Sequence, residues 1–513
     1  MSGPTRTATD DQQVQPLPRG ESPFDTSGIE RDAAGIAHYT GLPASLVAML
    51  RDSVAANPDG EALVEVGGRR LTYTELWDAS ARVAGGLVAA GVQRGDRVAN
   101  LLPAGVDWVL GFLGTQLAGA VAVPVNTRFA EPEIEYVLTD SGSEVVLRPG
   151  EPLPDGDPHA VDDLAPGDLA AIFYTSGTTG FPKGAMTSHE NFLSNVETAL
   201  RVVDIDRAEG PDSRSLVSVP LFHVTGCNSQ LLVQLALRGT TVVLPVFGVA
   251  AFLRTVVEER INSLTSVPAI YALALAQSDF GAHDVGAVTR LSYGGAPMAP
   301  ALIGRITDGF PNARLGNGFG LTETSSITTY LPHEWAAEHP DSVGFAAPVV
   351  DLALDEVDPE SGVGELLIRG PNVVLGYWNK PDATDEVMED GWFLTGDMAK
   401  VDEDGYFFIV DRKKELIIRG GYNVYPREIE EVLYEHPAVS EVAVIGVADD
   451  ALGEEVAAMV VLKAGAEASE DDIRAYAKER VAAYKYPRKV WFSDELPKGP
   501  TGKILKREIK PPE

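Results

Sequence analysis

Short apolar runs that alternate with helix-like segments restrict this chain to an α/β architecture. Residues 74–90 form an amphipathic segment, and Thr72 with Glu75 has capping-box spacing at its start. Strands separated by helices favour layers built on mainly parallel sheets. The strand-like runs lie at residues 98–102, 120–125, 170–174 and 241–244.

A different pattern begins near Asp411 and predicts a second domain. Residues 426–434 and 469–483 are helix-like, and Ser469 followed by acidic residues is typical of a helix start. Residues 442–447 and 456–462 predict strands. Because 513 residues exceed the size of one hydrophobic core, we expect more than one domain. The predicted parts are a polar flexible leader over residues 1–40, a large N-terminal domain over 41–411 and a compact α+β domain over 412–513.

Charge and cysteine content exclude several classes of partner. A net charge of −34 opposes binding to nucleic acids and anionic membranes. Residues 411–513 carry 17 basic and 20 acidic side chains, so we expect cations in this nearly neutral region to meet anionic ligands. The single cysteine, Cys227, excludes an intrachain disulfide and fits a cytoplasmic location. The most apolar stretch, residues 108–125, contains Gln116 and Pro124 and predicts a buried helix and strand, not a membrane span.

The strongest local motif is a loop rich in hydroxyls and glycines. It reads Thr175-Ser176-Gly177-Thr178-Thr179-Gly180-Phe181-Pro182-Lys183 and follows an apolar strand. Its amides and hydroxyls suit phosphate oxygens, and Lys183 adds a point charge. The Walker A pattern cannot be laid on it. An ordinary polar connector is the alternative interpretation.

Five further segments carry candidate chemistry, each with a plain structural alternative. Gly316–Thr324 lacks the third glycine of a dinucleotide fingerprint and follows no clear strand, but Glu323 suits Mg²⁺ among phosphates. Asp397, in a glycine-bounded turn, suits a ribose or a simple Asx turn. The remaining segments are Asp411-Arg412-Lys413-Lys414, Arg419-Gly420-Gly421-Tyr422 and Pro497–Lys503, where solvated charges are the alternative.

In this order and spacing, the motifs resemble the adenylate-forming superfamily, which includes acyl-CoA synthetases, peptide-synthetase adenylation domains and beetle luciferases. The resemblance runs from about Leu71 to Arg507, and residues 411–418 and 426–430 are most similar to fatty-acyl and aryl CoA ligases. It implies a large domain of α/β layers with a β-subdomain and a small mobile C-terminal domain. The implied reaction forms an acyl-AMP from a carboxylic acid and ATP, releases pyrophosphate, and transfers the acyl group to coenzyme A.

The resemblance also assigns roles around ATP. The loop from Thr175 to Gly180, with Lys183, would hold the β- and γ-phosphates; Thr322 would contact the α-phosphate and Glu323 would hold Mg²⁺. Asp397 and Arg412 match ribose-binding residues, and Lys503 matches the lysine that stabilises the adenylation transition state. The segments bordering adenine and the acyl pocket are Gly294-Gly295-Ala296-Pro297 and Asn317-Gly318-Phe319.

Rotation of the small domain about Lys414 would replace Lys503 with the thiol-binding Gly420-Gly421-Tyr422, aided by Lys413 and Arg419. His223, Val224, Gly294 and Gly320 match the acyl-pocket region, where small residues would leave room for a chain or ring. A core histidine is the alternative for His223. No aspartate stands near His223, so an α-amino acid is disfavoured; fatty acid is the first expectation and an aryl acid of the 4-coumarate type the second.

The acceptor and assembly stay open at this point. Free coenzyme A is expected from the basic candidates Lys413, Arg419, Lys485, Arg488 and Lys489, with an acyl carrier protein as alternative. A homodimer is one alternative for the assembly. A luciferase-like monooxygenase, a catalytically inactive binding protein and a nicotinamide dehydrogenase are the rival functions. Retention of Lys503, Glu323 and Asp397 argues against an inactive binding protein. The missing third glycine of the dinucleotide fingerprint argues against a nicotinamide dehydrogenase.

Overall fold

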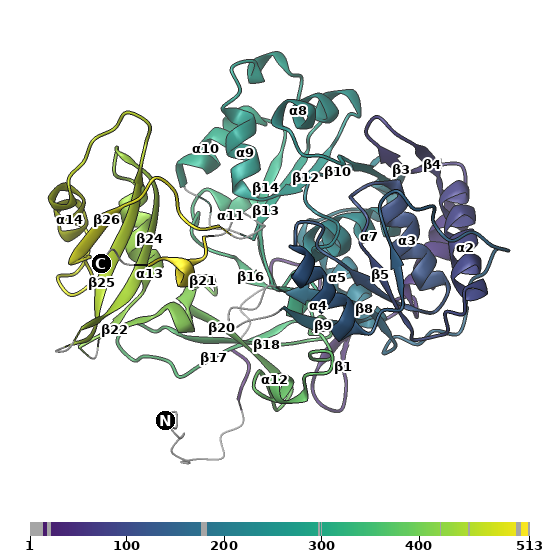
Figure 1. The fold of residues 1–513 in the computed structure, drawn as a ribbon, viewed down its shortest axis with the longest axis horizontal. Helices are drawn as coiled ribbons and strands as arrows, with labels where there is room; N and C mark the ends of the chain where they lie inside the picture. Colours follow the sequence, from purple (N-terminus) through teal and green to yellow (C-terminus); the bar gives the residue numbers. More distant parts are fainter. Residues whose placement is uncertain are drawn as a thin grey trace. The chain divides into compact units, whose positions relative to one another are not determined.

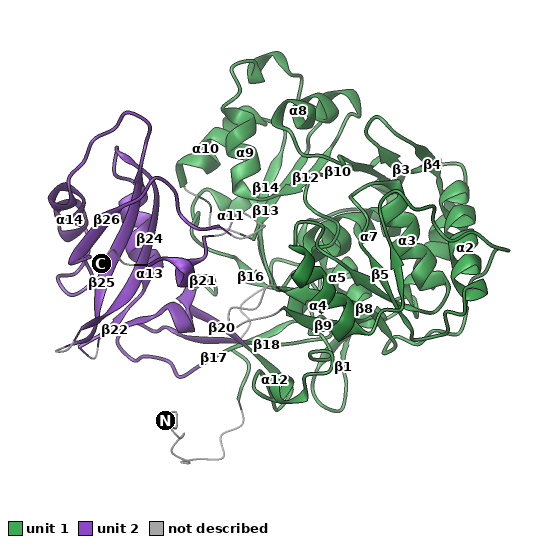
Figure 2. Cartoon of the chain, viewed as in Figure 1, with its two compact units in different colours: residues 1–353, 367–394, 402–407 green, residues 354–366, 395–401, 408–513 purple. Residues whose placement is uncertain are grey.

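The computed structural model describes residues 14–17, 22–175, 182–295, 298, 300–420, 422–449, 452–498 and 504–510. The chain divides into two compact units (Figure 2). The large unit comprises residues 1–353, 367–394 and 402–407, and the small unit comprises 354–366, 395–401 and 408–513. The small unit therefore takes two segments from before residue 411, where the sequence predicted a single division.

One sheet of the large unit carries the hydroxyl-rich loop. Its strand order is β7 (Val145–Leu147), β5 (Arg97–Asn100), β6 (Val121–Pro124), β8 (Leu169–Thr175) and β9 (Lys183–Ser188), and only the β8–β9 pair is antiparallel (Figure 1). Helix α2 (Tyr73–Ala89) starts with the predicted capping box between Thr72 and Glu75. Helix α3 (Val106–Leu117) is buried except at Asp107 and leads into β6, so the buried-helix prediction for residues 108–125 is confirmed.

The second sheet of the large unit has nine strands. They run in the order β16 (Phe345–Ala346), β15 (Thr329–Leu331), β14 (Arg314–Phe319), β13 (Arg290–Gly294), β12 (Ser263–Ser266), β10 (Arg214–Val217), β11 (Thr240–Val243), β3 (Glu61–Glu65) and β4 (Arg70–Thr72). All pairs from β3 to β14 are parallel. Helices α8 (Val249–Glu258), α9 (Pro268–Leu275) and α10 (Pro300–Gly309) share a buried core with these strands (Figure 1). The prediction of mainly parallel α/β layers is confirmed.

Three predictions about local structure are wrong. Part of the expected flexible leader forms a hairpin, β1 (Ile29–Arg31) and β2 (Ala37–Tyr39), because Tyr39 is buried and its hydroxyl lies 2.9 Å from Thr198 Oγ1. The glycine-rich segment at 316–319 lies inside β14. Asp397 lies inside β20 (Trp392–Val401) and not in a turn.

The small unit contains a sheet covered by two helices. Its strands are β23 (Tyr422–Val424), β22 (Ile417–Arg419), β25 (Gly453–Leu462) and β24 (Val439–Asp449) in that order, and β26 (Lys489–Phe492) pairs with β25. The strand pairs are antiparallel except for the parallel pair β25–β26. Helix α13 (Pro426–Tyr434) has the predicted bounds, and α14 (Glu470–Lys478) has Ser469 as its N-cap. Helix α14 ends before the predicted Ala483, since Tyr484 and Tyr486 beyond it pack against the core.

The other elements complete the chain. Among the described residues, no helix combines the length and hydrophobicity that a membrane crossing requires. The remaining bounds are α1 (Leu46–Ala56), α4 (Glu131–Ser141), α5 (His189–Val202), α6 (Val224–Gly226), α7 (Leu232–Leu237), α11 (His333–Ala336), α12 (Pro381–Asp385), β17 (Asp351–Asp355), β18 (Gly364–Arg369), β19 (Met388–Glu389) and β21 (Phe407–Arg412).

Candidate active site

The hydroxyl-rich loop joins the two antiparallel strands β8 and β9. Thr175 at the end of β8 pairs with Lys183 at the start of β9. The connection is thus strand–loop–strand and not the strand–loop–helix of a Walker A site. Within the described part of the chain the Lys183 ammonium forms no ion pair, so its charge is available to an anion. Ser176–Gly180, the centre of the predicted phosphate site, lies outside the described residues.

Glu323 lies in a turn that its buried neighbours hold firmly. The turn is the short 3₁₀ helix Thr322–Thr324, which follows β14. The buried Thr324 hydroxyl accepts hydrogen bonds from the Leu321 amide and the Thr328 hydroxyl, both at 2.9 Å. A Cβ atom at Gly320 would lie 1.3 Å from the Ser326 carbonyl oxygen, so only glycine allows this close approach. The fold therefore fixes the backbone from which the Glu323 side chain extends.

The environment of Glu323 fits Mg²⁺ held together with phosphates. Its Oε1 accepts a hydrogen bond of 2.8 Å from the Tyr377 hydroxyl. Among the described residues no group of three or more histidine, cysteine or acidic side chains could enclose a metal ion. Mg²⁺ commonly binds through one or two carboxylates plus substrate phosphates and water, so a single partly exposed carboxylate is a suitable ligand.

The predicted adenine and acyl segments lie at the carboxyl ends of β13 and β14. A Cβ at Gly294 would lie 2.3 Å from Gly318 O, so Gly294, like Gly320, serves close packing of the backbone. This role differs from the expected space for an acyl chain. The Asn317 side chain donates a 2.8 Å hydrogen bond to Ser342 O, which fixes the end of β14. Beside these strand ends Gly295 is exposed and Phe319 is half-buried, and Ala296 and Pro297 lie outside the described residues.

His223 is half-buried and neutral, and its Nε2 atom is buried. It precedes α6, which begins at Val224, and its ring centroid lies 4.9 Å from that of Phe222. Burial, together with the positive charge of Arg128, lowers the pKa of His223 to about 4. Its Nε2 is buried without a hydrogen-bond partner in the described part of the chain. Because buried polar atoms are rarely left unpaired, a ligand atom is a natural partner for this nitrogen.

The two predicted ribose residues are in contact within the small unit. Arg412 Nε, at the end of β21, lies 2.7 Å from Asp397 Oδ1 in β20. The Asp397 amide donates to Thr395 Oγ1 at 2.9 Å, and the Thr395 hydroxyl donates to Leu366 O at 2.7 Å. The structure therefore brings together a carboxylate and a guanidinium that are 15 positions apart in the sequence.

The residues predicted to bind the thiol differ in their surroundings: two cations are paired with glutamates, and a tyrosine is exposed. The Lys413 ammonium lies 2.7 Å from both Glu356 and Glu365, and the Arg419 guanidinium pairs with Glu455. These two cations are therefore already neutralised by carboxylates. The Tyr422 ring is 57% exposed and stacks on Tyr484 with 4.7 Å between centroids.

The other small-unit candidates divide between described and undescribed residues. Lys414 is the middle residue of a 3₁₀ helix, Lys413–Glu415. Gly420 donates its amide to Leu452 O at 2.8 Å. Gly421 and the predicted catalytic Lys503 lie outside the described residues.

The basic candidates for coenzyme A are also mostly engaged. Lys485 pairs with Glu428, and Arg488 lies 3.6 Å from the centroid of the Tyr486 ring. Lys489, at the start of β26, is exposed. The expected basic surface is therefore neutralised in part by neighbouring carboxylates.

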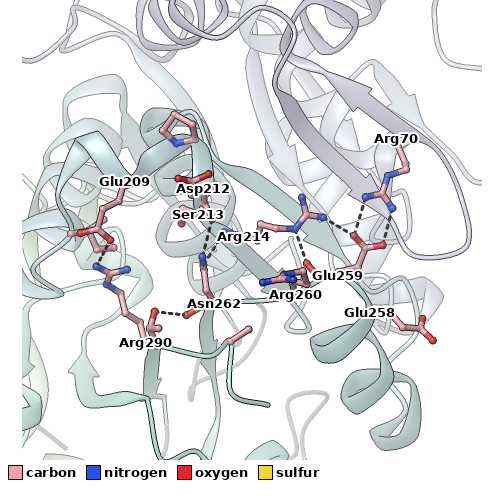
Figure 3. Close-up of a pocket in the computed structure, with 14 residues that line it drawn as sticks. Arg70, Glu209, Asp212, Ser213, Arg214, Glu258, Glu259, Arg260, Asn262 and Arg290 are labelled. Carbon is pink, nitrogen blue, oxygen red and sulfur yellow. Dashed lines mark hydrogen bonds and ion pairs between the residues drawn. The ribbon is translucent and has the colours of Figure 1, made fainter. Parts of the chain in front are cut away.

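A cavity of about 850 Å³ lies elsewhere in the large unit (Figure 3). Its lining includes Arg214 and Arg290, which begin β10 and β13, so it lies at the amino ends of these parallel strands. Ligands of open α/β sheets bind beyond the carboxyl ends. Figure 3 shows three of its arginines engaged with carboxylates: Glu259 contacts Arg70 and Arg214, and Glu209 contacts Arg290. The cavity is therefore a paired ion network and not the active site.

Two family models cover these sites. The model described as AMP-binding enzyme matches residues 50–378, and the model described as AMP-binding enzyme C-terminal domain matches 428–503. The chain belongs to the AMP-binding enzyme family. The first match contains the Thr175–Lys183 and Thr322–Glu323 segments, and the second contains Lys503. The resemblance inferred from the motifs is confirmed.

Relatives in the AMP-binding family specify the reaction class. The chain is 39% identical to feruloyl-CoA synthase from an Amycolatopsis species, with 87% of this chain and 95% of the relative covered. It is 37% identical to a long-chain-fatty-acid–CoA ligase of Mycobacterium tuberculosis, with 90% and 97% covered. Among solved structures, O-succinylbenzoate coenzyme A synthetase of Bacillus subtilis, in complex with ATP and magnesium ion, matches with a TM-score of 0.81 at 29% identity, covering 90% and 98%.

The protein is accordingly an AMP-forming acid–CoA ligase that uses ATP, Mg²⁺ and coenzyme A. The acid carboxylate attacks the α-phosphorus of ATP and pyrophosphate leaves. The thiol sulfur of coenzyme A then attacks the carbonyl carbon, and AMP leaves with the electron pair of the broken bond.

The motif analysis missed Tyr377, which contacts both Glu323 and Lys183. Its signal in the sequence is weak, because it lies in the apolar run Val373-Val374-Leu375-Gly376-Tyr377-Trp378, which suggests core packing. Only the fold brings this run beside β9, through an isolated bridge between Ala185 and Tyr377.

Proposed function

We propose that this ligase activates a hydrophobic carboxylic acid without an α-amino group, with a fatty acid as the first candidate. The observation that carries this proposal is the neutral His223, whose buried Nε2 has no hydrogen-bond partner within the described residues. A neutral imidazole can donate one hydrogen bond to a carboxylate oxygen, whereas an α-ammonium group would need a carboxylate partner. An aryl acid is the second candidate, favoured by the 39% identity to feruloyl-CoA synthase.

In the large unit, we assign ATP and Mg²⁺ to the hydroxyl-rich loop between β8 and β9 and to the Thr322–Thr324 turn. Thr175 to Gly180 and Lys183 hold the β- and γ-phosphates, Thr322 contacts the α-phosphate and Glu323 holds Mg²⁺. The bound cation supplies positive charge to the phosphate oxygens. The available charge of Lys183 and the rigid Thr322–Thr324 turn support these roles. The residues assigned to the adenine border are Gly295, Ala296, Pro297, Asn317, Gly318 and Phe319.

In the small unit, we assign the ribose hydroxyls to Asp397 and Arg412, whose contact supports a shared role. Lys503 stabilises the negative charge that gathers in adenylation. Rotation about Lys414 exchanges Lys503 for Gly420, Gly421 and Tyr422 in the thiol step. The exposed Tyr422 ring supports its part in this scheme. Lys413 and Arg419 serve mainly to position the surrounding backbone, because both pair with glutamates.

Lys503→Ala tests whether Lys503 acts in adenylation and not in thiolysis. Acid-dependent pyrophosphate release should fall by about 10²–10³-fold, the effect of removing one preorganised donor to a developing charge. Thiolysis of preformed acyl-AMP by coenzyme A should stay close to that of the wild type. Lys498→Ala is the matched control, because Lys498 lies in the same segment but pairs with Glu441. Equal loss in both half-reactions would remove Lys503 from its assigned role.

The acid is tested by pyrophosphate release over fatty, hydroxycinnamic and amino acids. A fatty-acid preference is expected, a hydroxycinnamic preference selects the second candidate, and an amino-acid preference overturns the proposal.

Loading of an acyl carrier protein and homodimer formation stay predictions. Side-by-side thioester assays with coenzyme A and carrier protein test the first, and sedimentation tests the second. Cytoplasmic localisation also stays a prediction.

A further inference from the structure

Residues 374–380 form a strap that ties β9 to the turn carrying Glu323. The Leu375 amide donates to Met186 O and the Met186 amide to Gly376 O, both at 2.9 Å. The Trp378 amide donates to Gly184 O at 2.8 Å. At the other end, the Val374 amide donates to Glu323 O at 3.0 Å. The strap thus extends the edge of the β8–β9 hairpin and reaches the backbone of Glu323.

Side chains at the far end anchor this strap to the end of α4. The Lys380 ammonium lies 2.9 Å from Asp140 Oδ1, and the Trp378 indole donates to Asp140 O at 3.1 Å. Asp140 Oδ2 also accepts a 2.8 Å hydrogen bond from the Tyr174 hydroxyl on β8. The position of the strap is therefore determined by the fold itself and needs no bound ligand.

Tyr377 is the residue of the strap that faces both proposed ATP-binding groups. Its hydroxyl donates to Glu323 Oε1 at 2.8 Å, and its ring centroid lies 4.9 Å from Lys183 Nζ. The side chain is buried, and a tyrosine phenol is protonated at neutral pH. A protonated phenol is a constant hydrogen-bond donor to the carboxylate.

We infer that Tyr377 is a positioning residue that orients the Glu323 carboxylate for Mg²⁺ and sets its place relative to Lys183. The hydrogen bond holds Oε1, whereas Oε2 has no hydrogen-bond partner within the described residues and is left for the cation. Partners of metal-binding carboxylates restrict their rotation, and their loss commonly weakens metal binding. This inference rests on the proposed assignment of Glu323 to Mg²⁺.

The test uses the full chain with Tyr377→Phe, which removes the hydroxyl and keeps the ring beside Lys183. Binding of Mn²⁺, as a probe for Mg²⁺, is measured by electron paramagnetic resonance with a non-hydrolysable ATP analogue. Mn²⁺ affinity should fall about 10-fold. Affinity for the metal-free analogue, measured by calorimetry, should stay unchanged because Lys183 keeps its neighbour. The Mg²⁺ concentration for half-maximal pyrophosphate release should rise in parallel.

Tyr73→Phe is the matched control, since the buried Tyr73 hydroxyl donates to Gly239 O at 2.8 Å in another part of the large unit. Tyr73→Phe should lose similar stability and keep its Mn²⁺ affinity.

Glu323→Gln distinguishes failure of the inference about Tyr377 from failure of the assignment of Glu323 to Mg²⁺. If Glu323→Gln weakens Mn²⁺ binding and Tyr377→Phe does not, the inference about Tyr377 is wrong and the Glu323 assignment stands. If Glu323→Gln has no effect, the assignment fails and the inference fails with it.

Discussion

Lys506 is a buried cation in the small unit, and Lys506→Met should destabilise that unit strongly. Its ammonium lies 2.8 Å from Glu430 Oε1 and 3.1 Å from Glu415 Oε2, and its side chain is 16% exposed. Burial alone would lower the pKa of Lys506, but the surrounding carboxylates outweigh this effect and raise it. Burial raises the pKa values of Glu430 and Asp411, and Lys506 opposes both increases. One cation thus compensates several buried carboxylates.

The loss of stability expected for Lys506→Met follows from this arrangement of charges. Removing one partner of a buried ion pair costs about 3–5 kcal/mol, because the remaining charge is left uncompensated. Partial exposure of Lys506 and Glu415 favours the lower end, about 3 kcal/mol. The cost should shrink as the pH falls, because carboxylates with raised pKa values take up protons before ordinary carboxylates do, and the protonated forms no longer need Lys506.

Hydrogen exchange resolves this effect within the two-unit chain. The Val444 amide, which donates to Glu430 Oε1 at 2.7 Å, and its β24 neighbours report on the small unit, and α2 amides are the internal control. A loss of about 3 kcal/mol makes exchange through opening of the small unit about 150-fold faster. Lys510→Met, an exposed lysine of the same terminal segment, should change nothing. A Lys506→Met effect below about 0.5 kcal/mol at pH 8 would refute the charge-compensation argument.

Two further predictions concern the hinge and the acyl pocket. Lys414→Pro fixes a backbone dihedral, so it should suppress one half-reaction far more than the other when adenylation and thiolysis are assayed separately; survival of both rates would place the hinge elsewhere. The pKa of His223 in the folded protein is about 4, so its neutral form stabilises the fold above pH 6.5, and this contribution is lost as the pH falls toward 4. Denaturant titrations give the free energy of unfolding at pH 7 and at pH 4.5. Its decrease between these two pH values should be smaller for His223→Gln than for the wild type, by up to about 2 kcal/mol. Equal losses would mean that His223 titrates normally.

Local signals in the sequence were sufficient to locate several elements of the fold. The capping box at Thr72 and Glu75, the bounds of α13 and the Ser469 cap depend on neighbouring residues, so the sequence contains them directly. The strand runs near residues 98, 121, 170 and 241 were placed within a residue or two for the same reason. The predicted leader was too long, because burial of Tyr39 depends on a partner, Thr198, that no local pattern reveals.

The motifs in their order carried the family resemblance, and that resemblance predicted the use of ATP, Mg²⁺ and coenzyme A and most of the candidate residues. Only the tertiary structure decided what those residues contact. It joined Asp397 to Arg412, paired Lys413 and Arg419 with glutamates, and placed Tyr377 between Lys183 and Glu323. A motif records which side chains are present, whereas burial, pKa and ion pairing depend on segments distant in sequence. Those properties therefore arise only when the sheets and turns bring such segments together.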